Sequence, residues 1–262
     1  MKKADYTKQD VLEAYSKVGL KLEDIAFCHS NIAFFGIPDG GMATSNLKSL
    51  FVDTFFEAVG PQGTFVMPTF SYTFPEKGVY DKKETPSVCG ILSEIVRLLP
   101  EAVRSDDPIF SVAALGGKAA AMAENVSQES FGKNSFWDRL YQDDGVVLNM
   151  NFGAAATYFH YVEKSLKVPY RFDKTFETLA RKDGTVQVRP TIYFCRDLSR
   201  PEMENNWLDI NQLAGERGVL KTVPLGRGYI SLMGARGIFD LIQEAVSKDQ
   251  YFLTKAIGQQ IV

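Results

Sequence analysis

The chain has 262 residues, of which 45% are hydrophobic and 23% are charged, and it carries a net charge of −3. This composition is typical of a globular protein, and the lack of a long basic run argues against a nucleic-acid partner. The sequence has neither a signal peptide nor an apolar window long enough to span a bilayer, so we expect no membrane association.

The cysteines and histidines restrict the chemistry further. Cys28, Cys89 and Cys195 lie far apart and form no CxxC pair, which favours a reduced, cytoplasmic protein. With two histidines, His29 and His160, and no clustered cysteines, we expect no metal site. The sequence also lacks the P-loop, GxGxxG and GxSxG motifs, which argues against the nucleotide-binding and serine-hydrolase mechanisms that use them.

The first part of the chain predicts a strand–helix–strand unit. A helix capped by Thr7 precedes a buried strand over Ile25–His29. After a glycine-bearing loop, Thr44 or Ser45 is expected to cap a helix that stops at Gly60, and the segment GTFVMPTF then forms a second strand. This order of elements implies parallel pairing through a right-handed crossover.

The middle of the chain predicts further alternation of helices and strands. Thr85-Pro86 has the pattern of a helix start, with threonine as the cap and proline in the first turn. Phe110–Leu115 reads as a strand, and helices are expected near Lys118–Glu124 and Phe136–Tyr141. A strand over Val146–Asn151 then leads into the segment that contains His160.

After Tyr170 the pattern predicts a partly antiparallel end. A hairpin is expected around Asp183-Gly184, with strands over Phe176–Arg181 and Thr185–Cys195, although Pro190 should weaken the second strand. The other expected elements are an acidic helix over Pro201–Glu216, strands over Val219–Pro224 and Tyr229–Met233, and a helix over Ile238–Val246. We therefore predict an α/β protein with one domain over residues 1–262: a mixed sheet with βαβ units, flanking helices and a partly antiparallel C-terminal part.

The segment GAAATYFHYVE is the strongest local signal for a catalytic site. In a helix, residues three apart are neighbours, so Thr157, His160 and Glu163 should form a polar ladder. A carboxylate beside an imidazole orients the ring and raises its basicity, which suits a general base near neutral pH. The alternative is a structural histidine, partly buried and satisfied by the carboxylate.

An ordered series of motifs resembles the aminoglycoside 3-N-acetyltransferase family, also called the antibiotic N-acetyltransferases. The similarity covers about Leu20–Phe172 and weakens toward the C-terminus. The motifs are His29-Ser30 with Gly36 and Gly40-Gly41; Gly60-Pro61-Gln62-Gly63-Thr64 with Met67-Pro68-Thr69; Thr85-Pro86-Ser87 with Gly90-Ile91-Leu92; Arg104-Ser105-Asp106-Asp107-Pro108 with Ser111; Phe131-Gly132 with Ser135; and Thr157, His160 and Glu163.

The resemblance implies acyl transfer from acetyl-coenzyme A, or another acyl-coenzyme A, to a primary amine. It places the coenzyme A and catalytic motifs in residues 20–172, and gives residues 173–262 the task of completing the fold and the acceptor cleft. It also implies that coenzyme A contacts the first loop and the central signature, namely His29, Ser30, Gly36, Arg104, Ser105, Phe110 and Ser111. The oxyanion donors are expected from the backbone amides of the His29–Gly36 loop or from the Thr157 hydroxyl.

One departure from the family pattern affects the expected acceptor. Asp107 occupies the place where the family signature usually has a histidine, so it either faces a cationic acceptor or prepares the turn at Pro108. Tyr72 and Tyr158 are candidates for an aromatic wall beside a sugar, although core packing is the other reading of either residue.

Two kinds of acceptor and one non-enzymatic role stay open from the sequence. An acidic cleft would favour an aminoglycoside antibiotic, and a basic pocket would favour a nucleotide-linked amino sugar. A non-catalytic coenzyme A-binding protein with the same fold is the third possibility. Aromatic residues make up 12% of the chain, and a homodimer contact among them is also open.

Overall fold

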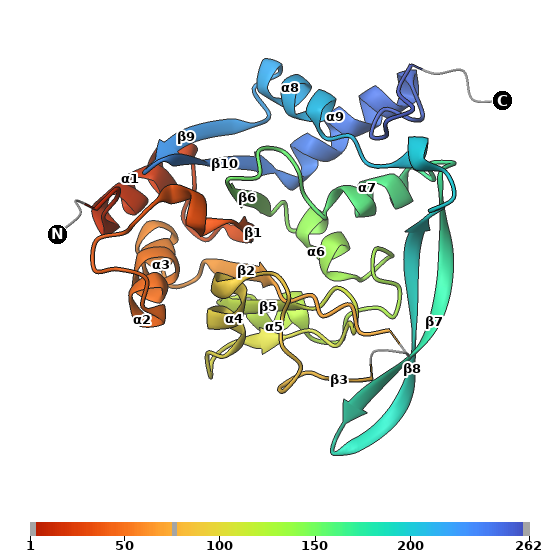
Figure 1. Ribbon diagram of the computed structural model, residues 1–262, viewed down its shortest axis with the longest axis horizontal. Coiled ribbons are helices and arrows are strands. Elements are labelled where there is room, and N and C mark those ends of the chain that lie inside the picture. The colour runs from red at the N-terminus through yellow and green to blue at the C-terminus, as the bar shows by residue number, and fades with distance from the viewer. Residues whose placement is uncertain (1–3, 75–77, 259–262) are drawn as a thin grey trace.

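The computed structural model describes residues 4–74 and 78–258, and a seven-stranded mixed sheet forms its centre (Figure 1). The strand order is β4-β5-β2-β1-β6-β10-β9, with β1, β2 and β6 parallel and the outer strands antiparallel to their neighbours. The predicted mixed α/β architecture is confirmed. The strands are β1 (Ile25–Ser30), β2 (Thr64–Pro68), β4 (Val103–Arg104), β5 (Val112–Gly116), β6 (Val146–Met150), β9 (Lys221–Leu225) and β10 (Gly228–Gly234).

The helices between β1 and β2 begin differently from the prediction. Thr7 caps α1 (Lys8–Val18) in a capping box with Asp10, as expected. In contrast, Ala43 is the N-cap residue of the next helix, so neither Thr44 nor Ser45 caps it. That helical segment runs through α2 (Thr44–Leu47), η2 (Lys48–Asp53) and α3 (Thr54–Val59), and Gly60 ends it with a positive φ of 79°. A short 3-10 turn, η1 (Ile32–Phe35), follows β1.

The expected helix start at Thr85-Pro86 is wrong. The helix α4 spans Ile91–Arg97, and Gly90 precedes it. Thr85 instead closes a turn after β3 (Val79–Asp81): its Oγ1 accepts from the amide of Asp81, and its own amide donates to the carbonyl of Asp81. A threonine before a proline also suits such a turn, because the residue before a proline avoids the helical backbone region.

Two further boundaries in the second half differ from the prediction. β5 begins at Val112 rather than at Phe110, because residues before it form a turn around Asp107. The acidic segment is split into η4 (Pro201–Met203) and a separate helix, so it is not one helix. The remaining helices are α5 (Ala119–Ala123), α6 (Phe136–Gln142), α7 (Phe159–Ser165), α8 (Leu208–Glu216) and α9 (Ala235–Lys248).

Alternate residues of the strands enter two separate hydrophobic cores. In β1, Ile25 and Phe27 point to the core beneath α5, α6, α7, α8 and α9. Ala26 and Cys28 point to the core beneath α1, α2, α3 and α4. The side-chain period of two in a strand therefore decides that His29 emerges on the α7 side of the sheet.

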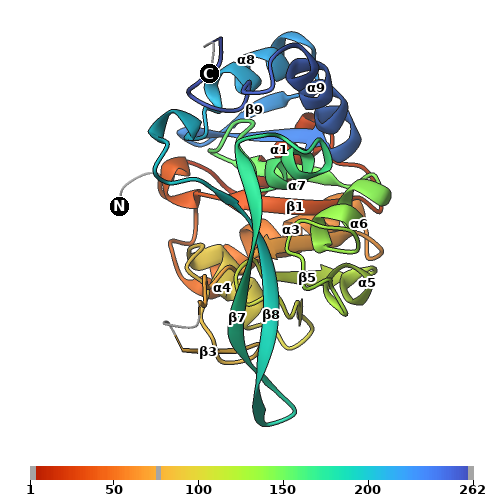
Figure 2. The same cartoon turned by 90° about the vertical axis from the view of Figure 1, so that its right-hand side faces the viewer.

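A long hairpin lies beside the sheet, at the edge where the carboxyl ends of β1 and β2 are found (Figures 1 and 2). It consists of β7 (Arg171–Lys182) and β8 (Thr185–Arg196), and β7 also pairs with β3 to form a second, three-stranded sheet. Pro190 does not interrupt β8, because β8 forms an edge of that sheet and an edge strand tolerates a missing N–H. In the part of the chain that is described, no helix has the length and apolarity to cross a bilayer.

Candidate active site

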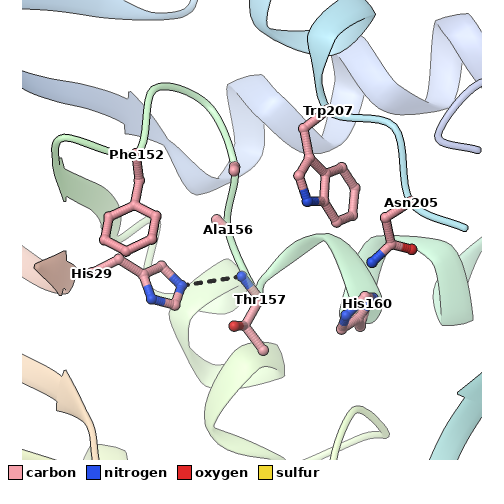
Figure 3. Close-up of a pocket in the computed structure, with 8 residues that line it drawn as sticks. His29, Phe152, Ala156, Thr157, His160, Asn205 and Trp207 are labelled. Atoms are coloured by element: carbon pink, nitrogen blue, oxygen red, sulfur yellow. Dashed lines mark hydrogen bonds between the residues drawn. The ribbon is translucent and has the colours of Figure 1, made fainter. Parts of the chain in front are cut away.

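Four segments far apart in the sequence surround a pocket of about 240 Å³ at the end of β1 (Figure 3). β1 supplies His29, the loop after β6 supplies residues 152–157, α7 supplies His160, and the segment before α8 supplies Asn205 and Trp207. Because the carboxyl ends of β1 and β6 lie at the same edge of the sheet, their following loops meet there. The lining residues are His29, Phe152, Ala155, Ala156, Thr157, His160, Asn205 and Trp207.

His160 and Glu163 form the pair that the helical spacing predicts. His160 Nδ1 lies 2.6 Å from Glu163 Oε2, and the Glu163 side chain is fully buried. Burial lowers the pKa of His160 and Arg171 acts in the same direction, while Glu163 opposes both. Burial alone would raise the pKa of Glu163, but its hydrogen bond and charge interaction with His160, together with Arg171 and Tyr170, bring it below its usual range. The buried carboxylate is therefore anionic and holds the ring in place.

Arg171 connects the buried carboxylate to the second pocket wall, and sequence reasoning missed it. Its Nε lies 2.8 Å from Glu163 Oε2, and its Nη2 donates to Asn205 Oδ1 at 2.7 Å. Tyr170 donates its hydroxyl to Glu163 Oε1 at 2.8 Å. Both residues closely follow α7 in sequence, which was the available signal, but nothing local indicates that β7 turns back toward Glu163.

His29 is tied to Thr157 across 128 positions of sequence. Its Nε2 accepts the Thr157 backbone N–H at 3.1 Å (Figure 3), which requires the neutral ring with its proton on Nδ1. Burial lowers the pKa of His29 to about 4. Thr157 precedes α7 instead of lying within it, so the predicted three-residue ladder on one helix is wrong for Thr157. Its side chain still lines the pocket.

Hydrogen bonds from the strands fix the loop that carries Thr157. Asn149 Nδ2 donates to the carbonyls of Gly153 and Ala155, at 2.8 and 2.9 Å. The Ser231 hydroxyl donates to the same Gly153 carbonyl at 2.9 Å. These bonds turn the chain from the end of β6 into α7, so the loop is held by the sheet beneath it.

Aromatic rings flank both histidines. The Phe131 ring meets His160 edge-on with centroids 5.4 Å apart, and the Trp207 centroid lies 6.2 Å from it. Phe152 lies 5.7 Å from His29 by the same measure. Trp207 and Phe152 line the pocket but were not predicted, because neither sits in a motif or a periodic pattern.

A second and larger cavity of about 580 Å³ meets the first at His160 and Asn205. The base of the β7–β8 hairpin forms most of its wall. The lining residues are Phe74, His160, Arg171, Phe172, Lys174, Phe176, Tyr193, Cys195, Arg196, Asp197, Leu198 and Asn205. His160 is thus accessible from two sides, which suits a group that acts between two substrates.

The central signature forms internal scaffold instead of lining either cavity beside His160. The Arg104 side chain is buried and donates to the carbonyls of Lys82, Thr85 and Thr69. Burial lowers its pKa, and its guanidinium lies over the Tyr80 ring. Ser105 and Ser111 are also buried; the Ser105 hydroxyl accepts from Val112 and the Ser111 hydroxyl donates to Thr69. The geometry gives these three residues structural roles and does not support their predicted contact with coenzyme A.

Asp107 and Phe110, two further predicted binding residues, line neither of the two cavities. Asp107 Oδ1 accepts from the amides of Ile109 and Phe110, so this carboxylate forms the turn before β5. Phe110 packs on Phe131, which in turn contacts His160. Phe110 therefore contacts His160 only through Phe131.

Four other predicted site residues line neither cavity, namely Tyr72, Tyr158, Gly36 and Ser30. Tyr158 is fully buried with its hydroxyl donating to Ala235, so it is a core residue. Tyr72 packs on Phe70 and Phe110. A Cβ at Gly36 would lie 2.3 Å from the Asp5 carboxylate, so this glycine makes room for Asp5. Ser30 ends β1 beside Met150 and lines neither cavity.

The sequence pattern of one protein family, described as Aminoglycoside 3-N-acetyltransferase, matches residues 29–247. The chain belongs to this family. A curated family relative, aminoglycoside N(3)-acetyltransferase IV from Salmonella sp., is 28% identical over 185 residues, which are 69% of this chain and 67% of the relative. The family resemblance and the expected class of enzyme, an acyltransferase, are thereby confirmed.

Solved structures of aminoglycoside 3-N-acetyltransferases share the fold. Aminoglycoside acetyltransferase AAC(3)-Xa gives a TM-score of 0.81 at 21% identity and covers 95% of this chain and 94% of its own. The AAC(3)-IVa apoenzyme gives a TM-score of 0.77 at 21% identity and covers 97% of this chain and 92% of its own. AAC-IIIb, in a binary complex with CoASH, gives 0.78 at 19% identity, covering 92% and 97%. At these identities the likeness establishes the fold alone.

Proposed function

We propose that the protein transfers an acyl group, most simply acetyl, from acyl-coenzyme A to a primary amine of an amino sugar or aminoglycoside, with His160 as general base. The observation that carries the proposal is the place of His160, which lies where two cavities meet and is held by a buried carboxylate. The AAC-IIIb complex supports coenzyme A as the acyl carrier.

The His160–Glu163 contact supports a role for each ring nitrogen of His160 in the proposed reaction. With Nδ1–H donated to Glu163, the Nε2 lone pair of His160 is free to take a proton from the attacking amine. The neutral amine nitrogen bonds to the thioester carbonyl carbon as its proton passes to Nε2, the carbon–sulfur bond then breaks, and the imidazolium returns that proton to the departing thiolate. Glu163 stabilises the imidazolium in between. Such assistance accounts for roughly 10²–10⁴ of the rate.

Thr157 is the better candidate for the oxyanion donor. The amides of Asn31, Phe34 and Gly36 already donate to backbone carbonyls, and the Thr157 amide donates to His29. The Thr157 hydroxyl lines the pocket beside His160 and can turn toward the developing oxyanion. This leaves His29 as the residue that positions the Thr157 loop, and as the one member of the predicted coenzyme A set that lines the pocket.

The smaller pocket suits the acyl thioester and the larger cavity suits the acceptor. Among the described residues that line the smaller pocket, none apart from the two histidines has an ionisable side chain, which fits an uncharged thioester arm. A structure of the relative AAC(3)-IVa, as a histidine-to-alanine mutant, is in complex with apramycin, which makes an aminoglycoside one acceptor to test. A nucleotide-linked amino sugar is the other.

Replacing His160 with Ala tests the proposal. We expect kcat to fall by roughly 10²–10⁴ in a thiol-release assay with acetyl-coenzyme A and a panel of aminoglycosides and nucleotide-linked amino sugars. Ser165→Ala is the matched control, because Ser165 lies on α7 and its hydroxyl donates to the Tyr161 carbonyl, away from the His160–Glu163 pair. An unchanged kcat in His160→Ala would remove the histidine from the mechanism. Coenzyme A binding without turnover on any amine would instead indicate the non-catalytic alternative.

A further inference from the structure

The larger cavity beside His160 has a cationic wall. Arg171, Lys174 and Arg196 line it, and among the described lining residues Asp197 is the one acidic side chain. Arg171 is balanced by the buried Glu163 at 2.8 Å. Asp197 Oδ1 accepts from the amide and the hydroxyl of Ser199, at 2.9 and 2.7 Å, and these bonds lower the pKa of Asp197 and keep it anionic. With Arg171 offset by Glu163, the charges of Lys174 and Arg196 exceed that of Asp197, so the cavity wall keeps a net positive charge.

Arg196 and Arg171 stand directly opposite each other in the hairpin ladder. Like charges at opposed positions of an antiparallel pair are destabilising unless an anion lies nearby. Glu163 serves Arg171, but within residues 4–74 and 78–258 neither Arg196 nor Lys174 forms an ion pair. The Arg196 charge also reaches the catalytic centre, because it contributes to lowering the pKa of His160. The hairpin thus holds a guanidinium without an ion-pair partner, in the described part of the chain, close to the base.

Aromatic side chains line the same cavity, on the face of the hairpin that alternates with the face carrying Arg171 and Arg196. Phe172 pairs with Cys195 and Lys174 with Tyr193, which places these side chains together on one face. Phe172 is 49% exposed, although it is a large apolar side chain. Lys174 Nζ lies 4.9 Å from the centre of the Phe176 ring. Exposed rings beside cations of this kind suit a ligand that combines a flat ring with phosphate groups.

We propose that this cavity binds the acceptor through its anionic part, so that the acceptor is a nucleoside diphosphate-linked amino sugar whose diphosphate is held by Arg196 and Lys174. The proposal rests on acyl transfer at His160. An aminoglycoside carries several positive charges and would meet repulsion at this wall, whereas a diphosphate neutralises it. The cavity volume of about 580 Å³ is within the range of pockets that take ligands of this size.

Charge-removing variants of the hairpin test the assignment. Arg196→Gln and Lys174→Gln should each raise KM for a uridine diphosphate-linked amino sugar by about tenfold, the effect of losing one charge-assisted hydrogen bond. KM for acetyl-coenzyme A should stay within about twofold. Lys182→Gln is the matched control, since it lies at the far end of β7, about 26 Å from Lys174 at ~3.3 Å per residue, and should change neither constant.

Further measurements distinguish an anion that belongs to the acceptor from one that belongs to acetyl-coenzyme A. Uridine diphosphate alone should compete with the acceptor and not with acetyl-coenzyme A. If Arg196→Gln instead raises KM for acetyl-coenzyme A, the anion belongs to the acyl donor and the proposal is wrong. A wild-type kcat/KM that is higher for aminoglycosides than for nucleotide-linked amino sugars also overturns it. Neither result would contradict the role of His160 as general base. That role would be contradicted by an unchanged kcat in the His160→Ala variant.

Discussion

At the scale of single residues, His29 and His160 are both neutral but are arranged for different tasks. Burial lowers the pKa of each ring. His160 bonds to the carboxylate of Glu163, which can stabilise a positive charge, while His29 accepts a backbone N–H, which cannot. The difference in partners explains why His160 suits proton transfer and His29 suits positioning.

His29 should make the protein sensitive to mild acid. Its pKa is about 4 in the fold and 6.5 when unperturbed, so between these values the unfolded chain binds a proton that the native chain does not. Stability therefore falls as the pH drops from 6.5 toward 4, by up to about 3 kcal/mol from this residue. His29→Gln, which keeps an acceptor for Thr157, should flatten this dependence in urea unfolding at several pH values. An equal slope in both proteins would contradict this origin.

The sequence was informative about residues whose partners are local. The His160–Glu163 spacing predicted their contact, and Asp107 before a proline allowed the turn that the structure contains. The internal contacts of Arg104 could not be predicted, because its donors reach carbonyls 19 to 35 positions away. Arg171 was missed for a similar reason, since its contact with Asn205 spans 34 positions. A buried arginine and a pocket-lining one look the same in a sequence.

At the scale of elements, the loop between β6 and α7 is the part of the site that depends most on its support. It delivers both Thr157 and His160, and its carbonyls are held by Asn149 from β6 and Ser231 from β10. The positions of both reactive side chains therefore depend on donors in the strands below.

Removing those donors should affect stability and turnover together. Asn149→Ala loses bonds to two loop carbonyls, and we expect unfolding free energy to fall by about 2–3 kcal/mol and kcat by about tenfold. Ser231→Ala loses one bond to a carbonyl that Asn149 also serves, so its effects should be smaller. Denaturant unfolding and steady-state kinetics on the two variants measure both. Larger losses of stability and kcat in Ser231→Ala than in Asn149→Ala would contradict the proposal that Asn149 is the main support of the loop.

Periodic elements were predictable, whereas their ends often were not. The short apolar runs of β1, β2 and β6 and the helical spacing after Thr7 predicted elements close to those observed. Thr85-Pro86 failed because the same residues suit a turn, and here β3 supplies Asp81 as the turn partner. The length of the hairpin exceeded the prediction, since Arg171–Lys182 begins in residues whose pattern does not alternate.

At the scale of the whole molecule, the seven-stranded sheet separates two cores, and only one of them supports the site. Trp137 packs on Phe131, which contacts His160. Phe55 lies on the other side of the sheet, among Tyr15 and Phe65. Stability is therefore spread over both faces, while the chemistry depends on one.

Two large-to-small substitutions should separate these contributions. Phe55→Ala and Trp137→Ala each remove a fully buried ring, so each should cost about 3–5 kcal/mol of unfolding free energy. At a temperature where both variants stay folded, Trp137→Ala should lower kcat, and Phe55→Ala should leave it within about twofold of wild type. A large loss of kcat in Phe55→Ala would show that the sheet does not isolate the two sides.

The hairpin that borders the larger cavity belongs to a separate sheet, outside the seven strands that hold His29 and Asn149. Exposed positions such as Phe172 and Lys174 contribute little to either core, so they can change without unfolding the protein. Evolution can then alter which amine is accepted while the base and its carboxylate stay fixed. Libraries randomised at these hairpin positions are accordingly where new acceptor specificities should be sought, with most members still able to fold.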